Sequence, residues 1–345
     1  MRALMRWLGM GCSGSRSKKD AYSRVAQYQK ESWALERAVS CPPEMLDWGT
    51  PPPGCITPIA LHNLMTDGFY APYAANPAYL LLVDCRSAKQ FTRRRLVRSK
   101  WYGTIQEDLP PYYSIVLYDE VPRAKAPDPQ ATGPLPELYH KLKQLRLNPQ
   151  VVMGGWQALQ ISCFYLMEQG GDQLLGPAKP PPWFPALIIP GLLYLGHAEM
   201  ACNDQVLLAL GITHVVAIAD RVPHTVLPAL NYLVVPIPEE DPVDMNPASG
   251  GTDLVASLPT LQAFVNEARE VGGRVLAHCD QGLTRGAALV MAFLMAERRA
   301  TLEDAFYYVR AARSAVHLHP GLLRQLLAYE RTLFGTCITS ADDLF

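Results

Sequence analysis

The chain carries, over residues 278–285, the stretch His278-Cys279-Asp280-Gln281-Gly282-Leu283-Thr284-Arg285. This stretch sets a thiol and a guanidinium six positions apart, around a glycine. The residues before it, 273–277, are apolar enough for a short buried strand, and those after it, 286–296, are rich in helix formers. The local pattern therefore predicts a strand, a tight turn and the first turn of a helix.

A turn of this kind forms a cradle for an anion. Its unpaired backbone N–H groups converge on one point, and the dipole of the following helix favours negative charge there. We expect Cys279 at the floor of the cradle and Arg285 on its rim, because a planar guanidinium matches two phosphate oxygens. The same field favours the thiolate, the form of the sulfur that attacks. A buried structural cysteine followed by an unrelated surface arginine is the alternative interpretation.

On these residues the stretch resembles the active-site signature of the protein tyrosine phosphatase superfamily, which is His-Cys, five residues and Arg. The resemblance implies that Cys279 and Arg285 are catalytic: the thiolate attacks phosphorus and the guanidinium holds phosphate oxygens. It also implies that the histidine orients the loop. The residues expected to bind the phosphate are His278, Asp280, Gln281, Gly282, Leu283, Thr284 and Arg285.

The reaction also needs a carboxylic acid that protonates the leaving oxygen. We expect this acid on the loop after the predicted strand 232–237. By resemblance Asp241 is the choice, with Glu239 and Glu240 as alternatives and Asp244 as a more distant one. No metal site and no cofactor are predicted.

Two positions depart from the family pattern close to the thiol. Gly286 stands where relatives have a Ser or Thr whose hydroxyl stabilises the thiolate, and Ala217 stands where they have an asparagine that braces the loop. Losing one well-placed donor in such a site lowers the rate by roughly two to three orders of magnitude. We therefore expect slow turnover or a long-lived phosphocysteine.

The second half of the chain, 186–335, resembles a dual-specificity phosphatase domain. Its pattern opens with two strands within 186–196 and ends in a closing helix–loop–helix that runs to about 326. Between them we predict a helix at 198–209, a helix-to-strand turn at 211–218, a strand at 232–237 and a helix at 258–268.

The first half, 56–172, alternates strands at 79–84, 114–118 and 151–153 with helices, which implies a parallel sheet. The motif at 84–87, Asp-Cys-Arg-Ser, and the Gly-Gly-Trp turn at 154–156 resemble a rhodanese-like domain. An active sulfurtransferase would carry a cysteine after 117–118, where this chain has Asp119. We therefore expect a non-catalytic domain, and an α/β fold for both halves.

A basic cluster follows the first predicted helix of this domain. In part it resembles the arginine cluster with which MAP-kinase phosphatases dock acidic grooves of kinases, and a solvated basic turn is the alternative. The cluster consists of Arg93, Arg94, Arg95 and Arg98.

The remaining segments complete the predicted domain map. Residues 1–50 are expected to be a disordered tail, 173–185 a proline-rich linker and 336–345 a C-terminal tail. The ending, 332–345, resembles that of the serine/threonine/tyrosine-interacting-like proteins, relatives with the same two domains that mostly lack the nucleophile.

The composition indicates in which compartment the protein is located and which partners are expected. The 345 residues carry 31 basic and 32 acidic side chains, so a nucleic-acid partner is not expected. Eight cysteines without CxxC spacing fit a reducing, cytoplasmic location. No apolar run approaches about 18 residues, and membrane attachment is expected only if translation starts at Met10, leaving Gly11 and Cys12 to be acylated.

Two functions remain open from the sequence. The first is a slow, cysteine-dependent protein phosphatase acting on phosphotyrosine, phosphoserine or phosphothreonine through a phosphocysteine. The second is a catalytically weak pseudophosphatase that binds phosphoproteins or regulates kinase signalling. Phosphorylated proteins are the expected partners, with MAP kinases as one candidate class.

Overall fold

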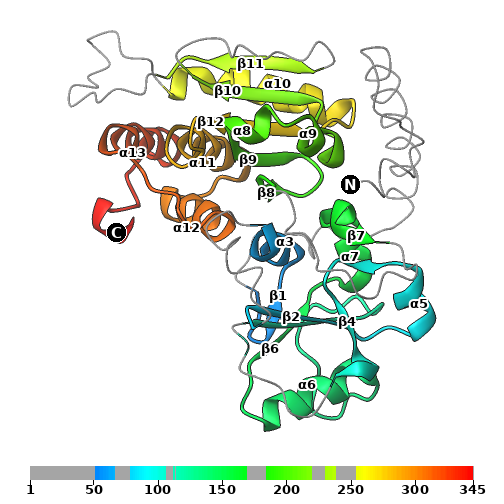
Figure 1. Cartoon of the computed structure of the whole chain (residues 1–345). Coiled ribbons are helices and arrows are strands. Elements are labelled where there is room, and N and C mark those ends of the chain that lie inside the picture. The colour runs from blue at the N-terminus through cyan, green and yellow to red at the C-terminus, as the bar shows by residue number, and fades with distance from the viewer. Residues whose placement is uncertain are drawn as a thin grey trace, which may run out of the picture.

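The computed structural model describes residues 51–66, 78–105, 112, 114–168, 184–219, 230–237 and 254–344. Two α/β domains follow one another along the chain, and Figure 1 shows them end to end with helix α3 at the junction. The predicted N-terminal tail and all but the last two residues of the predicted linker lie outside the described residues.

The N-terminal domain is built on a parallel sheet with the strand order β1-β6-β5-β2-β4. Its central strands are buried on both faces, as their continuous apolar sequences require. The strands are β1 (Cys55–Ile56), β2 (Leu80–Asp84), β4 (Lys100–Trp101), β5 (Ser114–Tyr118) and β6 (Pro149–Val152). The helices are α3 (Pro58–Thr66), α5 (Ala88–Arg93), α6 (Pro134–Gln144) and α7 (Gly155–Ser162), and β3 (Arg95–Leu96) pairs with β7 (Met167–Glu168).

The C-terminal domain has a second sheet with the order β11-β10-β12-β9-β8, in which only β8 and β9 run antiparallel to each other. The strands are β8 (Ala186–Ile189), β9 (Leu193–His197), β10 (His214–Ile218), β11 (Asn231–Val235) and β12 (Val275–Cys279). The helices are α8 (Ala198–Ala201), α9 (Asp204–Leu210), α10 (Leu258–Glu270), α11 (Arg285–Arg298), α12 (Leu302–Ala312) and α13 (Pro320–Phe334).

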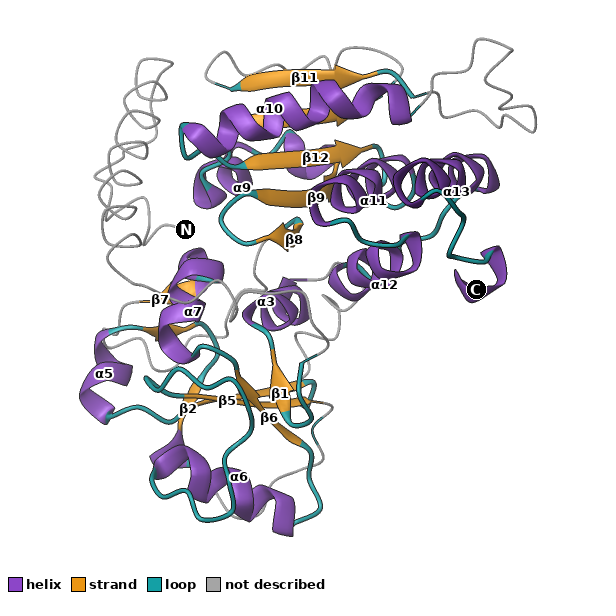
Figure 2. Cartoon of the chain, turned by 180° about the vertical axis from the view of Figure 1, so that it is seen from behind, coloured by secondary structure: helices purple, strands orange, loops and turns teal. Residues whose placement is uncertain are grey.

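Helix α11 is the centre of this domain. Its first eleven residues, 285–295, are all buried, because the helix is apolar on every side and packs against α10, α12 and α13. Figure 2 shows α11 and α13 side by side with α12 next to them. The helix that starts at the candidate site is thus fixed along most of its length.

Two local features differ from the sequence expectation. The helix predicted at 198–209 is split into α8 and α9, because Asn203 interrupts it and caps α9 by accepting hydrogen bonds from the N–H groups of Gln205 and Val206. Helix α3 was not predicted at all. It is buried between the two domains, so its sequence lacks the one-sided pattern of a surface helix.

A buried amide joins the domains. Asn63 on α3 accepts a hydrogen bond from the N–H of Leu187 at 2.9 Å and donates one to its carbonyl at 3.2 Å. Leu187 lies in β8, the edge strand of the second sheet. The side chain therefore takes the place of a neighbouring strand and pairs two backbone groups that would otherwise be buried without partners.

Asn63→Leu should destabilise the protein by about 2 kcal/mol, because it leaves both backbone groups of Leu187 unpaired in a dry junction. Urea unfolding of the full chain measures this loss, and the amide of Leu187 should exchange hydrogen faster. Asn148→Leu is the matched control, since that asparagine is exposed and its side chain accepts a hydrogen bond from the Lys143 ammonium. Equal stability of the two variants would contradict the role of Asn63.

The C-terminal segment contacts the C-terminal domain over the residues that the structure describes. Residues 336–344, expected as a tail, pack against the domain and end in the short helix η6 (Ala341–Leu344), whose Leu344 is buried. Among the described residues, no helix has the length and apolar character needed to cross a bilayer.

Candidate active site

The predicted strand, turn and helix are present around the candidate nucleophile. Strand β12 ends at Cys279, and α11 begins at Arg285. The Cys279 Sγ receives the N–H of Gly282 at 3.2 Å and that of Gly286 at 3.4 Å, and the residue is 2% exposed. These donors at a helix N-terminus favour negative charge on the sulfur.

Gly282 is required by the shape of the loop. Its φ is +67°, and a Cβ at this position would lie 2.2 Å from the carbonyl oxygen of Gly196 on β9. Only a residue without a side chain allows the loop to curl this closely against the neighbouring strand.

Hydrogen bonds to Asp280 and Ile237 hold Arg285 over the loop. Its Nη2 donates to the carboxylate of Asp280 at 2.8 Å, and its Nη1 donates to the carbonyl of Ile237 at 3.1 Å. Ile237 follows β11 and directly precedes the segment in which the general acid was expected. Asp241, Glu239, Glu240 and Asp244 all lie outside the described residues.

Three hydrogen bonds from outside the loop fix three of its carbonyls. Arg313 Nη2 donates to the Gln281 carbonyl at 3.1 Å. The N–H of Ala198 donates to the Asp280 carbonyl at 3.2 Å, and that of His317 to the Leu283 carbonyl at 3.3 Å. Sequence reasoning did not include Arg313 in the site, because nothing in its local pattern separates a loop-binding arginine from a surface one. His317 is exposed and contributes through its backbone.

Two histidines next to the loop are neutral at physiological pH. Burial lowers the pKa of His278 to about 4, against a smaller opposing effect of the Asp280 charge. Burial also lowers the pKa of His197, and the nearby charge of Arg313 adds to this. Neither imidazole therefore adds positive charge to the site, and His278 has the character of a buried structural residue.

The two positions that depart from the family pattern, Gly286 and Ala217, both lie next to the Cys279 loop. A Cβ on Gly286 would be 3.4 Å from the Cys279 Sγ and 3.2 Å from the end of the Leu195 side chain. Ala217 on β10 is fully buried and pairs in register with His278. The sulfur is thus without a hydroxyl from position 286, and the strand beside the loop is without an amide at position 217.

In the N-terminal domain, the loop after β5, where an active sulfurtransferase would carry its cysteine, holds no thiol. Asp119 accepts the N–H of Val121 at 3.1 Å and pairs with Arg123 at 2.8 Å, so a carboxylate occupies this position. Cys85 is buried, and its pKa is raised strongly by burial and by the charge of Asp119. Its sulfur stays a protonated thiol, which is the inert form.

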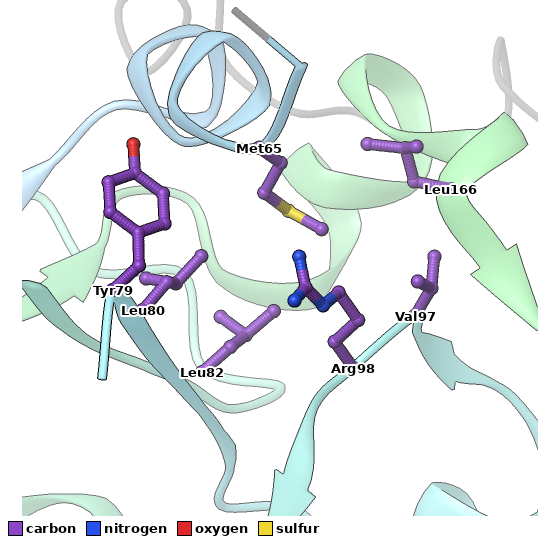
Figure 3. A pocket seen from close by; sticks show the side chains of 7 residues that line it. All are labelled: Met65, Tyr79, Leu80, Leu82, Val97, Arg98 and Leu166. Atoms are coloured by element: carbon purple, nitrogen blue, oxygen red, sulfur yellow. The ribbon is translucent and has the colours of Figure 1, made fainter. Parts of the chain in front are cut away.

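The predicted arginine cluster does not form one uniform basic face. Arg95 pairs with Glu168 at 2.8 Å and lies over the ring of Phe91. Arg98 remains exposed as a whole, but its guanidinium points into a small apolar pocket near Met65, where partial burial lowers its pKa (Figure 3). Arg93 is exposed and Arg94 half-buried. The other residues that line the pocket are Tyr79, Leu80, Leu82, Val97 and Leu166.

Comparison with known proteins identifies the C-terminal domain. The family model described as "Dual specificity phosphatase, catalytic domain" matches residues 193–332. A "Probable rhodanese domain-containing dual specificity protein phosphatase" of Dictyostelium discoideum is 33% identical over 150 residues, which cover 44% of this chain and 30% of the relative. "Dual specificity protein phosphatase 5" of Rattus norvegicus is 32% identical over 177 residues, which cover 50% of this chain and 44% of the relative. The crystal structure of human DUSP28 is 32% identical with a TM-score of 0.38, covering 45% of this chain and 97% of that one.

The chain therefore spans less than half the length of these two curated relatives. The family-model match lies on the domain that contains the Cys279 loop. The chain belongs to the dual-specificity phosphatase family, with a rhodanese-like α/β domain preceding the phosphatase domain.

Proposed function

We propose that the protein is a slow, cysteine-dependent phosphatase of phosphotyrosine, phosphoserine or phosphothreonine in proteins. The observation that carries the proposal is the pair of N–H groups directed at the Cys279 Sγ, at the start of the helix that carries Arg285. This arrangement stabilises a thiolate and offers a dianion both backbone donors and a guanidinium.

The proposed reaction has two steps. The Cys279 thiolate attacks phosphorus, an S–P bond forms, and the P–O bond to the side chain breaks while a carboxylic acid protonates the leaving oxygen. Water then attacks phosphorus and gives a proton to the carboxylate, which restores the acid, while the S–P bond breaks and inorganic phosphate and the thiolate are released. We propose Asp241 as the acid, with Glu239 and Glu240 as the alternatives, because all three follow Ile237, whose carbonyl is bonded to Arg285.

Slow turnover follows from Gly286. Without a hydroxyl beside the sulfur, the thiolate that leaves in the second step is stabilised by backbone N–H groups alone among the described contacts. The second step is therefore expected to limit the rate, and the phosphocysteine should accumulate.

Cys279→Ser should abolish turnover of a small aromatic phosphate monoester and of phosphopeptides, by at least about a thousandfold, because the variant lacks the nucleophile. The measurement is release of inorganic phosphate by the full chain. Mass spectrometry after acid quenching should detect phosphate on Cys279 in the unaltered protein only. Equal rates for the variant and the unaltered protein would end the enzyme proposal.

A phosphoprotein-binding pseudophosphatase is the second candidate, and Gly286 and Ala217 favour it. Binding needs only the loop N–H groups and Arg285, whereas turnover also needs thiolate stabilisation and an acid. This function predicts that phosphopeptides bind with no release of phosphate, and repeated turnover would exclude it.

Phosphorylated proteins are the partners we propose, with MAP kinases as one candidate class and the cytoplasm as the location. The arginine cluster supports kinase docking only weakly, since Arg95 is paired and Arg98 is turned into a pocket. Acylation of Gly11 and Cys12 from a Met10 start concerns residues outside the described part and stays a prediction.

A further inference from the structure

Asp280, the residue that directly follows the nucleophile, places a carboxylate at the mouth of the site. Its side chain is 54% exposed, whereas the side chain of its partner Arg285 is 7% exposed. The backbone of Asp280 is held by the N–H of Ala198. The carboxylate is therefore anchored at the loop and reaches from solvent onto the phosphate-binding guanidinium.

Arg285 already uses donors on both of its terminal nitrogens. Nη2 is bonded to Asp280, and Nη1 to the carbonyl of Ile237. A guanidinium binds a phosphate best through two parallel N–H groups. A phosphate dianion must therefore share Nη2 with a carboxylate of like charge or displace it, and either event weakens its binding.

The described surroundings offer Asp280 no second cation. Arg285 is its only ion-pair partner among the residues that the structure describes. The Arg313 guanidinium is bonded to the Gln281 carbonyl, and burial lowers the pKa of His278 to about 4, so that this imidazole stays neutral. A carboxylate displaced by substrate would remain at the mouth with its charge uncompensated.

We propose that Asp280 is a specificity-determining residue: its carboxylate competes with the substrate phosphate for Arg285 and, once displaced, selects phosphoresidues that have a basic side chain next to them. The inference rests on the proposed function, because it assumes that phosphate binds in this loop. A lysine or arginine of the substrate supplies the cation that Asp280 loses. A substrate with acidic neighbours of the phosphoresidue adds a second repulsion.

The first test measures binding of inorganic phosphate to the full chain by isothermal titration calorimetry. Asp280→Asn keeps the shape of the side chain and removes its charge, and it should bind phosphate about threefold to fivefold more tightly, which is the scale of a half-exposed ion pair. Glu297→Gln is the matched control. It breaks the pair between Arg269 on α10 and Glu297 on α11, about 18 Å along α11 from Arg285, and should leave the affinity unchanged. Equal or weaker phosphate binding by Asp280→Asn would overturn the proposal.

The second test compares two phosphotyrosine peptides that differ only in having arginine or glutamate beside the phosphoresidue. Binding is measured to Cys279→Ser and to the double variant Cys279→Ser/Asp280→Asn, so no turnover is required. The single variant should prefer the arginine peptide by about threefold to fivefold, and the double variant should lose most of this preference. An identical preference in both proteins would overturn the assignment.

The two proposals fail in different ways. If the unaltered protein releases no phosphate but Asp280→Asn binds phosphate more tightly, the phosphatase proposal fails and the role of Asp280 stands. If phosphate is released but Asp280→Asn changes neither affinity nor peptide preference, the role of Asp280 fails and the phosphatase proposal stands.

Discussion

Gly286→Ser is expected to raise turnover about a hundredfold, because it returns a hydroxyl to the thiolate. The new Cβ would lie 3.4 Å from the Cys279 Sγ, so its hydroxyl can reach the sulfur. The tightest neighbour is the end of the Leu195 side chain at 3.2 Å, which needs to shift by only a few tenths of an ångström. Steady-state release of phosphate measures the gain. The phosphocysteine that is expected to accumulate in the unaltered protein should be short-lived in the variant.

Gly286→Ala is the matched control for this experiment. It adds the same Cβ against Leu195 without the hydroxyl, so it should not raise the rate. A similar increase in both variants would mean that packing, and not hydrogen bonding to sulfur, limits the reaction. No increase with serine, in a protein that still binds phosphate, would favour the pseudophosphatase function.

Glu330→Gln is expected to destabilise the protein by about 3 kcal/mol. The Glu330 carboxylate is fully buried on α13 and accepts the N–H groups of Leu302, Ile338 and Thr339, each at 2.8 Å. It also accepts the hydroxyl of Thr339 at 2.7 Å. A glutamine side chain has one acceptor oxygen fewer, and its NH₂ group would face donors. The start of α12 and the C-terminal segment would both lose an anchor.

Chemical unfolding measures this loss, and the exposed Glu270→Gln is the control, expected within about 0.5 kcal/mol of the unaltered protein. Burial alone would raise the pKa of Glu330, but the hydrogen bonds from Leu302, Thr339 and Ile338 hold it below its ordinary 4.5. The stabilisation by the carboxylate is therefore complete above about pH 4.5 and is lost as the pH falls through the lower pKa of the folded state. The difference between variant and unaltered protein should shrink in the same range. A difference that is constant with pH would contradict this account.

Much of the architecture follows from local sequence patterns. The continuous apolar strands at 114–118 and 79–84 correspond to β5 and β2, and Thr301 caps the start of α12 by accepting a hydrogen bond from the Asp304 N–H. These elements were readable because each depends on its own residues: an apolar run of strand length or a side-chain cap. Helix α3 was missed because its burial between two domains removes the one-sided pattern on which such a reading depends.

The candidate site also has some features that the sequence predicts and others that only the structure shows. The loop and its flanking strand and helix were predicted from one contiguous stretch, and Gly286 could be identified beside it. The bond from Arg313 to the Gln281 carbonyl could not, since 32 residues separate them and nothing local pairs them. The acid proposed at Asp241 lies outside the described residues and stays a prediction.

The sequence by itself determined the chemistry that is available: a thiol, a guanidinium and a glycine at spacings that curl one turn onto a helix N-terminus. Only the tertiary structure decided which charges and carbonyls surround these groups, because such neighbours interact through space and not along the chain. It joins Asp280 to the arginine expected to bind phosphate, bonds that arginine to Ile237, and braces the loop through Arg313, the residue that follows α12. Such neighbours determine how strongly a loop of backbone N–H groups binds phosphate. A single nearby carboxylate raises the free energy of a bound phosphate dianion, because the two charges are alike.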